Sequence, residues 1–257
     1  MNTKAPTKIN QLLQKTPRGG LFLASWMYEN GISHELQRHY KNSHWLTSIG
    51  TGVMIRTGET PNIYGAIGSL NEQDNKHFSI GAMSALEMAG YSHYLPMGKR
   101  IVVLFSPKEE RLPSWFTQYD WGVYIRHYTT ECFNGITGIN TVMQDGFNLL
   151  ISSPERAFLE CLHLSPAYYN LTDLYYVMEM LSLLPSDKVQ KLLEDCKSIK
   201  VKRLFLYMAE KAGHDWFKLL NLSDIPLGNG KRAISKNGVY NSKYQITIPK
   251  ELENDAE

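Results

Sequence analysis

Apolar residues recur along the N-terminal part of the chain with the spacing of short amphipathic helices. They predict one helix over residues 8–15 and a second over residues 21–29. Gly31 can end the second helix in a left-handed conformation, and Ser33 can cap a third helix that buries Tyr40 on its apolar face. The β-prone runs "WLTSI" and "VMIRT" follow, and the "GTG" between them favours a tight hairpin.

The order helix, helix, turn, helix, hairpin is that of a winged helix-turn-helix. The next apolar segment, from "IYGAIGSLNEQ" to "IGAMSALEMAG", predicts a helical connector. Buried strands are then predicted at "KRIVVLF", "GVYIRHY" and "GFNLLIS", and a hairpin at Asn237-Gly238 near the end of the chain. Helices dominate between them, beginning with "SSPERAFLECL". We therefore expect an α+β chain with a winged helix and its connector in residues 1–92 and a helix-rich α/β domain in residues 93–257.

Composition and charge narrow the possible partners. The 257 residues are 43% hydrophobic and 20% charged, with a net charge of +2, which is typical of a soluble globular protein. The charge is uneven, because residues 1–56 contain seven basic residues against two acidic ones, a net +5, and the rest carries −3. A basic N-terminal module on a mildly acidic body indicates a polyanionic partner at that end.

The cysteines and the apolar runs indicate the cellular location of the protein. Cys132, Cys161 and Cys196 are far apart in sequence and form no Cys-x-x-Cys pair, so we expect reduced, buried thiols and no metal site. The N-terminus has no apolar leader segment, and runs such as "IVVLF" are too short to cross a bilayer. These features predict a cytoplasmic protein without a membrane partner.

The third predicted helix carries side chains suited to reading DNA. Arg38 can bind guanine in a bidentate fashion, and Gln37 or Asn42 can bind adenine, in a major groove that admits one helix. Lys41 and Arg56 would hold phosphates. The candidate DNA-binding residues are His34, Gln37, Arg38, Lys41, Asn42, Thr51 and Arg56. The alternative is a winged helix that docks onto a protein or is purely architectural.

A second basic cluster lies in the C-terminal half. Like charges at a helix start are unfavourable unless an anion compensates them, so a polyanion-binding surface is one interpretation. Internal pairing with acids such as Glu194 or Glu155 is the other. The residues of this candidate surface are Lys200, Lys202, Arg203, Lys231 and Arg232.

Catalytic signals are weak. The chain lacks the Gly-x-x-x-x-Gly-Lys-Ser/Thr phosphate loop, the Gly-x-Ser-x-Gly elbow and His-Glu-x-x-His. His34, His39 and His44 are five residues apart and do not share a helix face. We therefore expect no catalytic residue, metal or cofactor. The alternative is a nuclease or nucleotidyl-transfer enzyme that the winged helix targets to DNA.

Several segments together resemble one family. They are "GIS…Y…WL…IGTGV", "SALEMAGYSHYL", "SSPERAFLECL", "VKRLFLYMAEKAGHDW" and the closing "LGNGKR…NGVYNSKYQITIP". In this order they resemble the AbiEi-type antitoxins, which are the transcriptional-regulator half of abortive-infection AbiE type IV toxin–antitoxin systems. The resemblance extends over nearly the whole chain.

The resemblance implies a function for each half. The winged helix would repress the promoter of its own operon by binding repeated operator sequences in double-stranded DNA. The C-terminal domain would act as the antitoxin against a nucleotidyltransferase-like toxin, without forming a stable complex with it. By position, the resemblance carries the DNA-contacting role to all of the candidates above except Asn42. The antitoxin role maps only to a domain, and the second basic cluster is the candidate for its surface: Lys200, Lys202, Arg203, Lys231 and Arg232.

Overall fold

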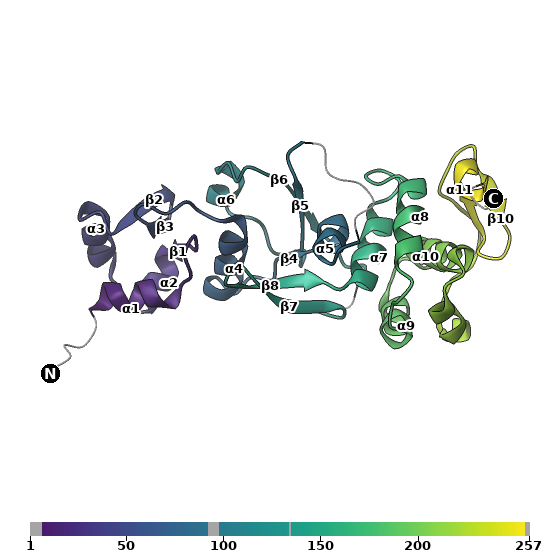
Figure 1. Cartoon of the computed structure of the whole chain (residues 1–257), viewed down its shortest axis with the longest axis horizontal. Helices are drawn as coiled ribbons and strands as arrows, with labels where there is room; N and C mark the ends of the chain where they lie inside the picture. The colour runs from purple at the N-terminus through teal and green to yellow at the C-terminus, as the bar shows by residue number, and fades with distance from the viewer. Residues whose placement is uncertain (1–6, 92–97, 134, 255–257) are drawn as a thin grey trace. The chain divides into compact units, whose positions relative to one another are not determined.

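The structure is a computed structural model that describes residues 7–91, 98–133 and 135–254 (Figure 1). Its helices are α1 (Lys8–Lys15), α2 (Ala24–Glu29), α3 (His34–Asn42), α4 (Ile63–Gln73), α5 (Ala82–Met88), α6 (Ser114–Gln118), α7 (Pro154–Leu164), α8 (Leu171–Met180), α9 (Ser186–Asp195), α10 (Ile199–Ala212) and α11 (Lys250–Asn254), with 3₁₀ turns η1 (Asp215–Leu219) and η2 (Leu222–Asp224). Its strands are β1 (Phe22–Leu23), β2 (Leu46–Gly50), β3 (Val53–Arg56), β4 (Ser79–Ile80), β5 (Ile101–Ser106), β6 (Tyr124–Thr129), β7 (Ile139–Gln144), β8 (Phe147–Ser152), β9 (Arg232–Ala233), β10 (Val239–Asn241) and β11 (Ile246–Ile248). The predicted α+β class is confirmed.

The chain forms two compact units, each assembled from separate segments. Within the described residues, unit 1 comprises residues 7–79, 99–127 and 141–150. Unit 2 comprises residues 80–91, 98, 128–133, 135–140 and 151–254. The predicted boundary at residues 92–93 lies outside the described residues.

Unit 1 begins with the winged helix. Its three-stranded sheet has the order β1-β3-β2, and β1 pairs antiparallel with β3 through Phe22↔Met54 and Leu23↔Val53. This pairing explains why α2 begins at Ala24 and not at residue 21, because the first residues of the predicted helix form β1 instead. The predicted hairpin is confirmed, and its β2 and β3 arms pair antiparallel.

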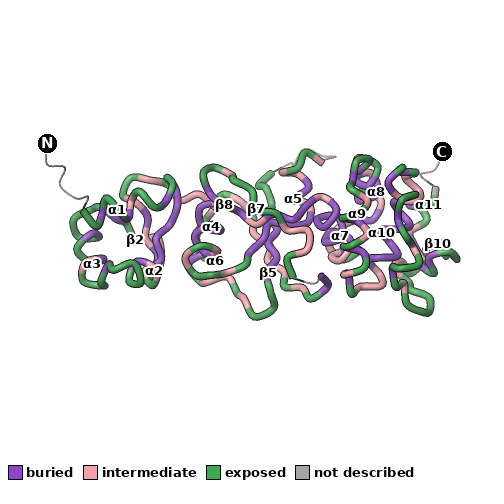
Figure 2. Tube along the Cα trace, turned by 90° about the horizontal axis from the view of Figure 1, so that it is seen from below, coloured by how far each residue is buried: buried purple, intermediate pink, exposed green. Residues whose placement is uncertain are grey.

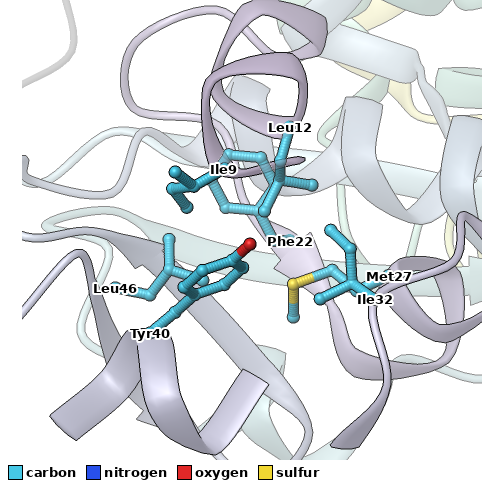
Figure 3. Packing of buried hydrophobic residues seen from close by; sticks show 7 residues of the cluster. All are labelled: Ile9, Leu12, Phe22, Met27, Ile32, Tyr40 and Leu46. Atoms are coloured by element: carbon cyan, nitrogen blue, oxygen red, sulfur yellow. The ribbon is translucent and has the colours of Figure 1, made fainter. Parts of the chain in front are cut away.

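One apolar cluster holds the winged helix together. Figure 3 shows it in close-up, with Tyr40 of α3 lying among side chains from the other helices and the sheet. Burial of each such side chain contributes roughly 1.5–3 kcal/mol. The buried residues of the cluster are Ile9, Leu12, Phe22, Met27, Ile32, Tyr40 and Leu46.

The five-stranded sheet has the order β6-β5-β4-β8-β7. Strands β5, β6 and β8 were predicted from their apolar runs, whereas β4 and β7 were not. Strand β7 leaves Val142 and Met143 exposed and shows no alternation of burial, so it carries no period-2 signal. The predicted helical connector is likewise divided, because β4 separates α4 from α5.

Helices α7 and α10 form the interior of unit 2. Both are buried over most of their length, as the purple tube in Figure 2 shows. Arg156 and Glu160 of α7 form a buried ion pair at 2.9 Å, and Glu160 also accepts a 2.9 Å hydrogen bond from the backbone N–H of Ala82. This carboxylate therefore ties α7 to the start of α5.

The C-terminal sheet has the order β10-β11-β9, with β11 antiparallel to β10 and parallel to β9. The hairpin predicted at Asn237-Gly238 is wrong, because these residues lie between β9 and β10, which do not pair. A Cβ atom at Gly238 would lie 1.8 Å from the carbonyl oxygen of Ile248. Glycine at this position thus permits a close approach of backbones. The hairpin turn lies later, between Asn241 and Ile246.

Candidate nucleic-acid interface

Local sequence signals position the candidate recognition helix α3. Gly31 has a φ of 80°, which glycine adopts at little cost, and the chain reverses there between α2 and α3. The side-chain oxygen of Ser33 accepts a hydrogen bond from the backbone N–H of Leu36 at 3.3 Å, as predicted for a cap. Glu35 lies in the first turn, where a negative charge is favourable.

The outward face of α3 carries Arg38, Lys41 and Asn42, whereas its inward face buries Tyr40. Figure 2 shows exposed stretches along this helix. Among the described residues, neither Arg38 nor Lys41 has an ion-pair partner. Both cations are therefore free to meet an external anion.

His34 is also exposed, at the start of α3. Its ring stacks on that of Tyr28, with centroids 5.0 Å apart and an interplanar angle of 13°. Tyr28 is 57% exposed, so the pair presents an aromatic surface to solvent next to the turn between α2 and α3. This arrangement keeps His34 among the residues that can reach DNA.

Gln37 does not belong to this outward face. It is 3% exposed, and its side-chain amide donates hydrogen bonds of 3.0 Å to the carbonyl oxygens of Ala24 and Ile32. The prediction that Gln37 reads adenine is corrected here, because its amide is used inside the protein to hold α3 against α2.

Arg56 is likewise a structural residue. Its guanidinium donates to the carbonyl oxygens of Leu13 and Thr16, and forms a 3.2 Å ion pair with Glu59. Its side chain is only 19% exposed. The predicted phosphate contact is therefore corrected: Arg56 joins the end of α1 to the sheet.

Thr51 is exposed at the turn of the short β2–β3 hairpin. Residues on both sides of the turn are already paired, Val53 with Gly50 and with Leu23 of β1. A Cβ atom at Gly50 would lie 2.7 Å from the Cβ of Trp115, so the end of β2 packs against that side chain, whereas a Cβ atom at Gly52 in the turn would meet no described atom within 4 Å. The predicted DNA-binding residues that are exposed are therefore His34, Arg38, Lys41, Asn42 and Thr51.

Sequence reasoning overlooked other exposed side chains near α3. Glu35 lies three residues before Arg38 and seven before Asn42, which places all three on one helix face. Trp45, 49% exposed, directly precedes β2. Trp45 stands out in the structure because it is a large aromatic residue that is exposed. No sequence pattern distinguished Glu35 from the acidic residues at other helix starts.

The second basic cluster is mostly internal. Arg203 is 2% exposed, and its guanidinium donates to the carbonyl oxygens of Leu227, Gly228, Gly230 and Gln245 at 2.6–3.1 Å. The prediction that Arg203 lies on a binding surface is wrong. The internal pairing weighed against it does occur, but with carbonyl groups and not with Glu155 or Glu194.

Two lysines of α10 follow the same pattern. Lys202 donates to the carbonyl oxygen of Pro226 at 3.3 Å, and Lys200 to that of His163 at 2.9 Å. Burial lowers the pKa of both amines. Both are therefore removed from the candidate surface, which retains Lys231 and Arg232. Lys231 is exposed and lies over the ring of Tyr240 at 4.9 Å from its centroid.

Comparison with known families decides the identity of the chain. A family model described as "Transcriptional regulator, AbiEi antitoxin, Type IV TA system" matches residues 99–249. A second model, described as the AbiEi antitoxin N-terminal domain of such regulators, matches residues 5–97. The chain belongs to the AbiEi antitoxin family. Membership makes it a transcriptional regulator and antitoxin of a type IV toxin–antitoxin system, with DNA and a toxin as its general partners.

The AbiEi fold of this chain also occurs in a solved structure of low sequence identity. The crystal structure of the RV2827C protein from Mycobacterium tuberculosis is 15% identical, with a TM-score of 0.61 over 97% of this chain and 93% of that chain. At this identity the likeness shows the fold alone. No curated protein matches the chain significantly.

Two further observations concern other partners of this AbiEi protein. No helix in the described ranges combines the length and apolar character that a membrane span requires. Within residues 7–91, 98–133 and 135–254, no group of three or more His, Cys, Asp or Glu side chains is arranged to hold a metal ion. Both family descriptions name transcriptional regulators.

Proposed function

We propose that this chain represses its own operon by inserting α3 into the major groove of repeated operator sequences. The single observation that carries the proposal is the outward face of α3, where Arg38 and Lys41 are exposed and have no ion-pair partner among the described residues. The opposite face is anchored by Tyr40 and Gln37, so the helix is presented rigidly.

The chemistry assigns a role to each side chain of this face. Arg38 donates to a guanine edge, Asn42 binds adenine, and Lys41 pairs with a phosphate. His34 stands at the start of the helix, and its stacking on Tyr28 restrains its orientation. Glu35 lies on the same face, where its carboxylate disfavours non-specific contact with phosphates and can accept a hydrogen bond from cytosine.

Fluorescence anisotropy tests this role directly. A labelled duplex from the region upstream of the gene is titrated with the full chain at two salt concentrations, beside a scrambled duplex. We expect tight binding to the upstream duplex alone, and weaker binding at higher salt, because counterions are released from the phosphates. Equal, weak binding to both duplexes would assign α3 to protein docking or to the scaffold.

The antitoxin role is proposed for unit 2. The toxin that it counters is a nucleotidyltransferase-like enzyme, and the neutralisation requires no stable complex. Lys231 and Arg232 are the exposed basic residues that remain of the candidate surface, and they suit a polyanion such as the RNA on which a toxin of this class acts.

Co-expression with the toxin gene of the same operon tests this second role. We expect the full chain to restore growth, and Lys231→Ala with Arg232→Ala to restore it less, while Lys236→Ala serves as an exposed basic control. A tagged chain should not retain the toxin in a pull-down. Rescue that is unaffected by the double substitution would remove these two residues from the proposal.

Among the residues that the structure describes, no group of His, Cys, Asp or Glu side chains arranged to hold a metal supports the enzyme alternative. A nuclease or nucleotidyl-transfer site needs carboxylates that converge on a metal or nucleotide. A thermal-shift screen with divalent metals and nucleotides tests it, and a saturable rise in the melting temperature would restore this alternative.

A further inference from the structure

Two cysteines that are 64 residues apart in sequence meet inside unit 2. The Sγ atoms of Cys132 and Cys196 lie 3.5 Å apart, and both residues are buried. Cys132 lies between β6 and β7, and Cys196 is the residue at which α9 ends. The third cysteine, Cys161, is fully buried on α7 and has no thiol partner among the described residues.

The backbones on both sides of this pair are already held together. The N–H of Lys197 donates to the carbonyl oxygen of Cys132 at 2.8 Å, directly beside Cys196. The N–H of Cys132 donates to the hydroxyl oxygen of Thr130 at 3.0 Å. A disulfide needs the sulfur atoms to approach to about 2.05 Å, and side-chain rotation between such adjacent backbones supplies that approach.

Basic residues lie near each of the two thiols. His163 lies beside Cys132, and its carbonyl oxygen accepts a hydrogen bond from Lys200. The hydrogen bond from the Cys132 thiol is the main cause that lowers the pKa of Cys196, and the charge of Lys202 acts in the same direction. That hydrogen bond and burial raise the pKa of Cys132. Of the two thiols, Cys196 therefore loses its proton more readily, and a thiolate is the reactive form.

We propose that Cys132 and Cys196 form a reversible oxidation site, at which a peroxide converts the two thiols into an intramolecular disulfide. The Cys196 thiolate attacks one peroxide oxygen, the O–O bond breaks, and the departing oxygen leaves as water with the proton of Cys132. The Cys132 thiolate then attacks the sulfur of the Cys196 sulfenic acid, whose S–O bond breaks to release hydroxide, and this hydroxide takes up the proton that Cys196 lost on ionising and leaves as the second water. Two thiols are oxidised by two electrons in total, which the peroxide accepts, and a dithiol reductant reverses the reaction.

The disulfide would fasten one segment of unit 2 to its helical interior. Cys132 precedes the stretch in which the carbonyl oxygens of Gly135 and Thr137 accept hydrogen bonds from Arg156 of α7. Cys196 lies between α9 and α10. A cross-link across 64 residues restricts the unfolded chain, so oxidation should stabilise unit 2. The inference does not depend on DNA binding by α3.

The test uses the reduced full chain treated with hydrogen peroxide. Remaining thiols are alkylated, and peptide mapping by mass spectrometry identifies the linked residues. We expect a peptide that joins Cys132 to Cys196, a melting temperature raised by several degrees, and reversal of both by dithiothreitol. Cys161→Ser is the matched control and should behave as the wild-type chain.

Single substitutions separate the roles of the two thiols. Cys132→Ser removes the thiol that resolves the intermediate, so the sulfenic acid at Cys196 should accumulate and react with dimedone. Cys196→Ser should reduce that labelling by at least about tenfold. A wild-type chain that yields no Cys132–Cys196 peptide, or that oxidises Cys161 at the same rate, would overturn the proposal, and this measurement does not depend on the folding of any variant.

Discussion

The side-chain amide of Gln37 donates a 3.0 Å hydrogen bond to the carbonyl oxygen of Ala24, and this bond joins α3 to α2. A second donated bond reaches Ile32. Replacing Gln37 by Ala leaves two buried carbonyl groups without these donors, so we expect it to lower the free energy of unfolding by roughly 1–3 kcal/mol. Urea unfolding measures the change. Arg38→Ala, one residue further on the exposed face, is the control and should stay within about 0.5 kcal/mol.

Arg38→Ala should weaken DNA binding while leaving the stability of the chain nearly unchanged. If it reads a base, Arg38→Ala costs about 1–3 kcal/mol of affinity for the upstream duplex and much less for a scrambled one. Anisotropy titrations of both duplexes give this difference. An unchanged affinity for the upstream duplex would show that α3 is not the reading helix, because no other side chain of its outward face is an arginine.

Lys41 should affect all duplexes alike. A lysine that pairs with a phosphate contributes affinity without sequence preference, so Lys41→Ala should weaken binding to every duplex by a similar factor. The slope of log K against log salt should become shallower by about one unit, since one fewer counterion is released. A slope equal to that of the wild-type chain would place Lys41 outside the interface.

Local signals in the sequence predicted the winged helix well because they act over a few residues. Helix α1 begins and ends where the apolar spacing predicted, and Ser33 caps α3. Pairing between distant segments left no such signal. Phe22 and Leu23 were predicted as the start of a helix, but they pair with β3 and form a strand. Asn237-Gly238 was predicted as a hairpin turn, but the backbone of Ile248 lies close to Gly238 instead.

The candidate sites were harder to predict because sequence does not show which way a cation points. The sequence alone does not distinguish Arg38, Arg56 and Arg203. Arg38 faces solvent, whereas the guanidinium groups of the other two donate hydrogen bonds to backbone carbonyl groups of distant segments. Only the tertiary structure distinguishes a binding residue from a structural one in these cases. The contact between Cys132 and Cys196 was not predicted either, because it too is formed only by the tertiary structure.

The position of Arg203 leads to a stability prediction. Its guanidinium serves four backbone carbonyl groups of the C-terminal segment, which includes the loop before β9. Arg203→Met keeps much of the side-chain volume and removes these donors, so we expect the free energy of unfolding to fall by at least about 3 kcal/mol. Lys231→Ala is the exposed control and should change it little. Chemical unfolding followed by circular dichroism measures both; equal stability of the two variants would contradict the structural role of Arg203.

His127 provides a prediction on pH. Its Nε2 lies 2.7 Å from the hydroxyl oxygen of Ser106, and the ring of Phe78 packs against it edge-on. Burial lowers the pKa of His127 below its ordinary value of 6.5, and the charge of Arg111 acts in the same direction, against an opposing effect of Glu110. The folded chain therefore binds this proton less readily than the unfolded chain.

Stability should consequently be highest above pH 6.5 and should fall as the pH drops from that value through the lowered pKa of the folded state. Melting temperatures at about pH 7.5 and about pH 5.5 measure the loss. His127→Asn retains an amide that can bond to Ser106 but cannot take up a proton, so its melting temperature should change less between the two pH values. His44→Asn is the control, because His44 is exposed with a φ of 58°, a conformation that asparagine tolerates. A His127→Asn chain with the pH dependence of the wild type would show that another group titrates.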